Sequence, residues 1–235
     1  MDTNLETARS ASQVPNDVAY RHVRHNVTML LGEVPSPEDL SVPACPEWTI
    51  QDVVAHLTGI SAFAIGRTSG WVRPEQSSLG IDIAGLLSEW DRMGAQAERL
   101  IAQSGGQRGS IMVMDAFTHE LDIRYAINAP LPAEHPAYQR AFQVLLNGFS
   151  ASVIAHNLPA LTICIDGREW QAGVGEPIAT LTADRYDLYR SLAGRRTHDQ
   201  IARLDWSRDS HRWLPAFTWG PFTPPKHPTE KPTAG

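Results

Sequence analysis

One helical stretch, MVMDAFTHELDIRYAI at residues 112–127, carries a carboxylate and an imidazole that can act together. Asp115 and His119 are four residues apart, so a helix places their side chains one turn apart on the same side. A carboxylate and an imidazole at this spacing can share one divalent ion. A second stretch, ACPEWTIQDVVAHLTG at residues 44–59, predicts a capped helix that carries His56 beside its apolar stripe.

These side chains predict one metal site if the two helices face each other. His56 lies about 100° from the centre of its apolar stripe, so it flanks the packed face of its helix. Three protein ligands, His56, Asp115 and His119, leave coordination positions open, as in catalytic rather than structural zinc sites. The alternative is that Asp115 and His119 form a solvated pair worth a few tenths of a kcal/mol. His56 would then be a satisfied core or boundary histidine.

Further polar side chains are candidates for roles around such an ion. Asp122 lies one turn beyond His119 and could hydrogen-bond a liganding imidazole; a solvent-facing charge is the alternative. Arg124 and Arg195 could contact carboxylates of a substrate or of a thiol cofactor. For the adjacent Arg196, an exposed position is the favoured interpretation.

Other residues of reactive or aromatic type are interpreted as structural. Cys45 has no basic neighbour in sequence to depress the pKa of its thiol, so packing is favoured over catalysis. Trp48 precedes the N-cap Thr49 and is interpreted as a staple across the helix start. His22 and His25 are three residues apart, but no carboxylate beside them completes a set of ligands. The sequence shows neither a Gly-rich phosphate loop nor a Ser-His-Asp signature.

Four helices must position the candidate ligands. Apolar residues at helical spacing predict helices at about 15–34, 50–64, 81–102 and 111–127. Thr49 offers the N-cap of the second helix, and Asp52 resembles the partner in a capping box. Prolines argue against any regular element over residues 35–48, and Gly, Ser and Pro predict a loop near residues 69–80. Four helices joined by loops suggest an antiparallel bundle.

The pattern changes after a linker near residue 130. The sequence predicts a helix at 137–157, a hairpin at 160–173 with its turn at Asp166–Gly167, a strand at 177–184, and a helix at 185–206 interrupted near Gly194. The predicted fold class is therefore mainly α with a smaller α+β part. A four-helix bundle at residues 15–130 precedes a C-terminal α/β domain at residues 131–222. Residues 1–14 and the Pro-rich tail at 223–235 are predicted to be disordered.

The composition restricts the classes of function. The chain has 235 residues, of which 42% are hydrophobic and 20% charged, as expected for a globular protein with a real core. A net charge of −6 without a basic stripe argues against a nucleic-acid partner. No apolar run is long enough to span a bilayer, so no membrane partner is expected. The N-terminus lacks a secretory pattern, and two distant cysteines indicate the reducing cytoplasm.

Three segments, VPACPEWTIQDVVAHL, FTHELDIRYAI and LYRSLAGRRTHDQIARLDW, resemble the mycothiol-dependent maleylpyruvate isomerase family, a branch of the DinB-like superfamily. The resemblance extends from about residue 15 to residue 222. It implies a DinB-like four-helix bundle followed by an α/β domain. It also implies a metal ligand at His56 and a Glu-x3-His pair that falls on Asp115 and His119. The aspartate departs from that pattern by one methylene, although Asp is a competent zinc ligand.

The resemblance further implies a divalent metal, zinc by preference, and mycothiol as a thiol co-substrate. A metal-stabilised thiolate can attack an electrophilic carbon of a small substrate. The adduct is either kept, which makes an S-transferase, or rotates and expels the thiol, which makes a cis–trans isomerase. The second domain is expected to close the pocket and to contribute Arg195 to an anionic group. The rival hypothesis is a non-catalytic DinB-like ligand-binding or regulatory protein; either would be a monomer or a homodimer.

Overall fold

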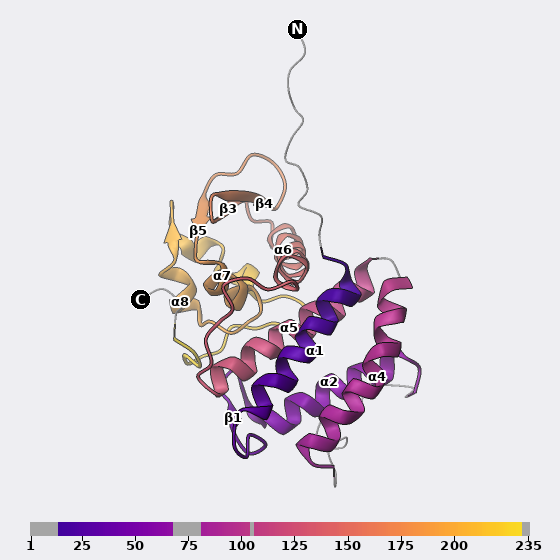
Figure 1. Cartoon of the computed structure of the whole chain (residues 1–235). Helices are drawn as coiled ribbons and strands as arrows, with labels where there is room; N and C mark the ends of the chain where they lie inside the picture. The colour runs from indigo at the N-terminus through magenta and orange to yellow at the C-terminus, as the bar shows by residue number, and fades with distance from the viewer. Residues whose placement is uncertain (1–13, 68–80, 104–105, 232–235) are drawn as a thin grey trace.

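The computed structural model describes residues 14–67, 81–103 and 106–231 (Figure 1). Its N-terminal half is a bundle of four helices: α1 (Asn16–Gly32), α2 (Ile50–Ala64), α4 (Ile83–Gln103) and α5 (Gln107–Ala126). Helix α1 packs against both α4 and α5, and α2 packs mainly against α4. Helix α2 meets α5 over a shorter stretch, which leaves room for polar side chains between them. The predicted loop at 69–80 and residues 1–13 of the predicted N-terminal disorder lie outside the described residues.

A buried polar cluster ties three of these helices together. The indole Nε1 of Trp90 on α4 donates to the Tyr20 hydroxyl on α1 and to the Ser61 hydroxyl on α2, at 3.0 Å each. The two hydroxyls are 2.7 Å apart. Each side-chain polar group of this cluster thereby finds a partner, as buried polar groups require. The cluster fixes how α2 lies against α1 and α4.

Helix α5 is buried around almost its whole circumference, unlike an ordinary surface helix. It packs against α1 on one side and against α6 (Tyr138–Ala155) on the other. Helix α5 therefore packs in both the bundle and the C-terminal part. The hydrophobic core runs without interruption from α1, through Phe117 and Leu121 of α5, to Phe149 of α6.

The C-terminal part contains a four-stranded sheet in the order β4-β3-β5-β6. Its elements after α6 are β3 (Leu161–Ile165), β4 (Arg168–Ala172), β5 (Thr180–Thr182), α7 (Arg185–Leu192), α8 (His198–Ala202), β6 (Asp205–Trp206) and two 3-10 turns, η1 (Ser210–Arg212) and η2 (Leu214–Phe217). The predicted hairpin is confirmed: β3 and β4 pair antiparallel across Asp166 and Gly167, whose φ angles are 51° and 73°. Such left-handed pairs form the tight turns that match strand twist. The predicted fold class, mainly α with a smaller α+β part, is confirmed.

The absence of regular structure predicted for residues 35–48 is wrong. Strands β1 (Ser41–Val42) and β2 (Cys45–Thr49) form a small antiparallel ribbon that leads directly into α2. Prolines are compatible with this ribbon. Pro43 lies in its turn, and Pro46 lies in a two-stranded sheet, in which each strand forms backbone hydrogen bonds along one edge only. The ribbon places Cys45 and Trp48 beside the start of α2.

The sequence predicts disorder over residues 223–235. The structure instead describes residues 223–231 as folded back onto α7 and α8. Glu230 is buried there between two arginines, and this ion pairing is the physical reason that a Pro-rich segment is held in place. Residues 232–235 lie outside the described part. Among the described helices, none combines the length and the hydropathy needed to cross a membrane.

Candidate metal centre

The start of α2 fixes the position of His56. A capping box defines this start: the Thr49 hydroxyl accepts a hydrogen bond from the Asp52 backbone N–H at 3.3 Å, and the Asp52 carboxylate accepts from the Thr49 N–H at 2.9 Å. His56 follows in the second helical turn and is only 8% exposed. Its ring faces α5 across the short contact between the two helices, since its Nε2 lies 3.2 Å from Asp115 Oδ2.

The three predicted ligands converge on one point. His56 Nε2 lies 3.2 Å from Asp115 Oδ2, and His119 Nε2 lies 3.9 Å from Asp115 Oδ1. The two imidazole rings are 4.9 Å apart between centroids and stand edge to face. One donor atom from each residue lies within 4.8 Å of the donor atoms of the other two.

This donor set fits a divalent transition metal. Two imidazoles and one carboxylate are a ligand combination of catalytic zinc sites, which leave a position for water or substrate. His119 suits this role because burial lowers the pKa of its imidazole, although the neighbouring Asp122 acts in the opposite direction. A neutral imidazole is the form that binds metal. Burial raises the pKa of Asp115, but the two histidines outweigh it and the pKa falls below its ordinary value, so the carboxylate is ionised.

Asp122 holds the other side of the His119 ring. Its Oδ2 lies 2.9 Å from His119 Nδ1. With the proton on Nδ1, the Nε2 nitrogen, which lies 3.9 Å from Asp115 Oδ1, keeps its lone pair for a metal ion. Burial alone would raise the pKa of Asp122, but the guanidinium groups of Arg195 and Arg190 hold it well below its ordinary value. Arg195 Nη2 donates to Asp122 Oδ2 at 2.9 Å, and Arg190 Nη2 donates to Asp122 Oδ1.

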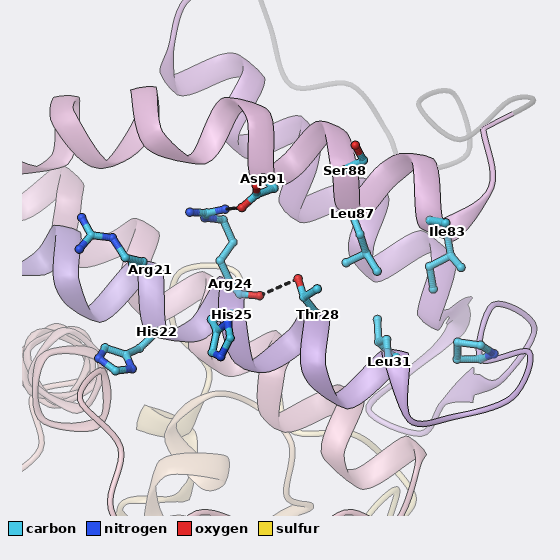
Figure 2. A pocket seen from close by; sticks show the side chains of 13 residues that line it. Arg21, His22, Arg24, His25, Thr28, Leu31, Ile83, Leu87, Ser88 and Asp91 are labelled. Atoms are coloured by element: carbon cyan, nitrogen blue, oxygen red, sulfur yellow. Dashed lines mark hydrogen bonds and ion pairs between the residues drawn. The ribbon is translucent and has the colours of Figure 1, made fainter.

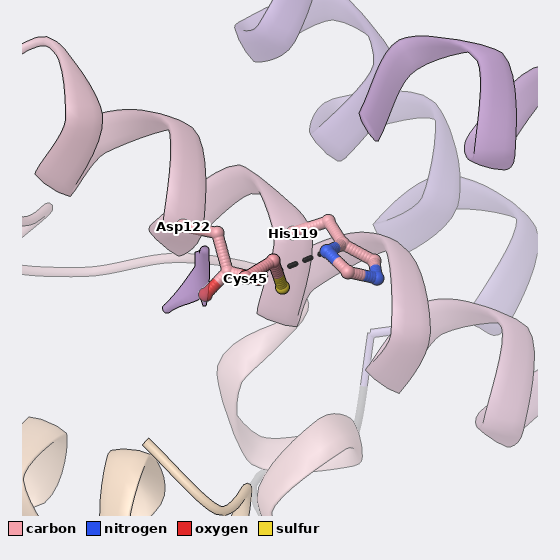
Figure 3. A group of neighbouring side chains, drawn as sticks. All are labelled: Cys45, His119 and Asp122. Atoms are coloured by element: carbon pink, nitrogen blue, oxygen red, sulfur yellow. Dashed lines mark ion pairs between the residues drawn. The ribbon is translucent and has the colours of Figure 1, made fainter. Parts of the chain in front are cut away.

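A second group of possible ligands, Cys45, His119 and Asp122, lies next to the first (Figure 3). Burial raises the pKa of the Cys45 thiol to about 11; Asp122 adds to the rise and Arg195 opposes it. The thiol is therefore neutral near pH 7. Arg195 Nη2 also lies 3.8 Å from Cys45 Sγ. A cation at this second group would meet the guanidinium that already neutralises Asp122, so His56, Asp115 and His119 are the better ligand set.

Trp48 lies over the two candidate histidine ligands as well as at the helix start. Its ring stacks on that of His119 at 5.8 Å between centroids, and lies 5.3 Å from that of His56 at a tilt of 48°. The indole therefore covers both imidazoles, and the β1–β2 ribbon forms part of the surroundings of the site. The sequence interpretation as a helix staple missed this contact because the aromatic neighbour His119 is distant in sequence.

The structure brings Asp122 and Arg195 to the cluster but not Arg124. Arg124 donates from Nε to Glu120 at 2.8 Å and from Nη1 to the Pro130 carbonyl at 2.9 Å. Position 124 is about 140° around the helix from position 119, so the two side chains leave α5 on different sides. The prediction that Arg124 contacts the bound substrate or thiol is therefore not supported by its position.

Arg196 was predicted to be exposed, and this is wrong. The residue is 2% exposed, and its guanidinium contacts Glu230, Asp187 and the Tyr125 hydroxyl. The sequence gives no signal for Arg190 beyond its place in the segment LYRSLAGRRTHDQIARLDW. It is fully buried and contacts Asp122 directly.

A groove of about 880 Å³ lies elsewhere, between α1 and α4 (Figure 2). His22 and His25 line it, beside Arg24 and Asp91. Asp91 is the carboxylate among the lining residues, and it accepts a 2.5 Å hydrogen bond from Arg24. None of the three candidate ligands lines the groove.

The fold and the site together define a class: a four-helix bundle that carries a two-histidine, one-carboxylate cluster and shares one helix with a small α+β part. A solved structure has the same fold. It is the crystal structure of a histidine-to-alanine mutant of mycothiol-dependent maleylpyruvate isomerase, with a TM-score of 0.54, 12% sequence identity, and coverage of 83% of this chain and 92% of that chain. A second crystal structure of mycothiol-dependent maleylpyruvate isomerase covers the same shares at a TM-score of 0.49.

At this identity the likeness establishes the fold, and the resemblance seen in the sequence is confirmed at that level. No protein-family model matches the chain. No curated protein matches it in sequence either.

Proposed function

We propose that the protein is a metal-dependent enzyme that uses a low-molecular-weight thiol of the mycothiol type to isomerise or conjugate a small electrophile. The observation that carries this proposal is the convergence of His56, Asp115 and His119, with one donor atom each within 4.8 Å. The fold shared with a mycothiol-dependent isomerase supports the same chemistry. Both cysteines are free thiols, which suits a reducing compartment such as the cytoplasm.

In this proposal His56, Asp115 and His119 hold a divalent ion, zinc by preference. Such an ion supplies a Lewis acid that lowers the pKa of a thiol bound to it. The protein residues do the rest. Asp122 orients His119 through its Nδ1, and Trp48 covers both imidazoles and limits the access of water.

Arg195 is the proposed contact for an anionic group of the substrate or thiol. Its side chain keeps 12% of its surface exposed, whereas Arg190 on the other side of Asp122 keeps none. Arg195 therefore reaches both the buried Asp122 carboxylate and the side of the cluster near Cys45. This arrangement supports a contribution of the C-terminal part to the surroundings of the candidate metal centre.

An activity panel tests the function. Zinc-loaded protein is incubated with mycothiol and small electrophiles, among them cis-alkene diacids for isomerisation and alkylating agents for conjugation. We expect turnover that requires both the thiol and the metal. No turnover of any substrate by fully loaded protein would favour the rival, a non-catalytic ligand-binding protein.

The variant Arg195→Ala should separate substrate binding from metal binding. We expect a rise of roughly tenfold or more in the KM for the acidic substrate or for the thiol, which is the loss of about one charge-assisted contact. Zinc content measured at saturating zinc should stay at the wild-type level because all three candidate ligands remain, so the change in KM is read on fully loaded protein. Arg203→Ala is the matched control, since Arg203 is an exposed arginine of the same part of the chain. Unchanged kinetics in Arg195→Ala would assign Arg195 to support alone.

A further inference from the structure

The segment at 223–231 returns to the surroundings of the candidate metal centre and places one carboxylate inside the protein. The Gln200 side-chain amide donates to the Glu230 carbonyl at 2.9 Å, and Arg196 Nη2 donates to the Lys231 carbonyl at 3.2 Å. These backbone contacts fix the segment at Glu230 and at the residue that follows it. The side chain of Glu230 is 0% exposed.

Glu230 and Asp122 are connected through a single guanidinium. Arg190 donates from Nε to Glu230 at 3.0 Å, and its Nη2 contacts both Glu230 and Asp122. Its Nη1 donates to the Thr118 carbonyl on α5 at 3.2 Å. The Arg190 side chain is itself 0% exposed. Its guanidinium plane is therefore set from two sides, by α5 and by Glu230.

Charge balance makes Glu230 necessary to this arrangement. Within residues 14–67, 81–103 and 106–231, the ion pairs connect the buried carboxylates of Asp122, Asp187 and Glu230 with the guanidinium groups of Arg190, Arg195 and Arg196. Without Glu230 the group carries one excess positive charge, which is costly where water is excluded. Arg190 would then satisfy its donors on Asp122, in competition with His119 for the same carboxylate.

We propose that Glu230 is a positioning residue for the metal centre: through Arg190 it holds the Asp122 carboxylate in place against His119. This inference rests on the proposed metal site, and it adds a part of the chain outside the bundle to the determinants of metal affinity. A change at Glu230 alters the metal centre while leaving all three ligands intact.

The test compares Glu230→Gln, Glu230→Asp and the control Glu176→Gln, an identical change at an exposed glutamate of the same part of the chain. Two properties are measured on full-length, folded protein well below its melting temperature. One is the Kd for zinc alone, by competition with a chelating dye. The other is the NMR resonance of the His119 Nδ1–H proton in zinc-free, 15N-histidine-labelled protein, assigned by its loss in His119→Ala.

We expect Glu230→Gln to weaken zinc binding by roughly three- to tenfold, less than the roughly tenfold to hundredfold typical of a direct partner of a ligand. The His119 resonance should shift. Glu230→Asp, which keeps the charge, should recover most of the affinity and shift the resonance less, and Glu176→Gln should match wild type. A purely structural role would lower the melting temperature of Glu230→Gln without changing either property of the folded protein.

Wild-type affinity together with an unshifted resonance in folded Glu230→Gln would overturn the proposal. If that variant does not fold, the His119 resonance of Glu230→Asp decides alone, because the shorter carboxylate must still displace Arg190; an unshifted resonance in that variant would overturn the proposal. The wild-type measurement separates this inference from the function on which it rests. Zinc binding that requires His56 but ignores Glu230 refutes the inference only, whereas a wild-type protein that binds no zinc refutes both.

Discussion

His56→Ala should lose zinc and abolish the thiol-dependent reaction, because it removes one of three ligands from a site with no spare imidazole among the residues that form it. We expect activity to fall by about 1,000-fold or more, which corresponds to about 4 kcal/mol of transition-state stabilisation. Zinc per chain, measured after loading and removal of free metal, should fall from near one to near zero. The fold should remain, since imidazole removal leaves the capping box of α2 intact.

The matched control is His25→Ala, which removes an exposed imidazole from α1. It should keep both zinc and activity. Equal zinc content in His56→Ala and wild-type protein, each loaded to saturation, would refute the site.

Asp122→Asn is expected to have the largest effect on stability. The carboxylate is fully buried between Arg190 and Arg195, and its loss leaves two guanidinium groups without their shared counter-charge. Breaking a buried ion pair in this way typically costs about 3–5 kcal/mol in the free energy of unfolding. Because Asp122 also orients His119, zinc affinity should fall by roughly tenfold to hundredfold.

Denaturant unfolding of zinc-free protein measures the first effect, and zinc titration measures the second. Asp199→Asn is the control, since this exposed aspartate of α8 undergoes the same chemical change. A stability equal to wild type would show that the two arginines find other counter-charges. An unchanged zinc affinity would separate Asp122 from the metal centre.

Local spacing predicted that the three candidate ligands could come together, and the structure places one donor atom of each within 4.8 Å of the others. Asp115 and His119 share one side of α5 because they are four residues apart, and His56 could be placed beside the stripe of α2 by the same geometry. The helices themselves were predictable because their apolar residues recur at helical spacing. These predictions depend on residues within a few positions of one another.

The residues that surround the ligands were not predictable in this way. Arg195 and Asp122 are 73 positions apart, and Arg190 and Glu230 are 40 apart, so no helical or strand period connects them. Arg196 was predicted to be exposed because arginine usually is. It is buried because Asp187 and Glu230 neutralise it, and Glu230 lies in a segment whose composition predicts disorder.

The shared position of α5 has a consequence for how the protein unfolds. Phe117 and Leu121 belong to a core that continues into α6, so neither part of the chain can lose α5 without exposing apolar surface of the other. The two parts are therefore coupled thermodynamically and should melt in one cooperative transition rather than as independent units. Zinc bound at the proposed site between α2 and α5 would then raise the free energy of unfolding of both parts together, and not that of the bundle alone.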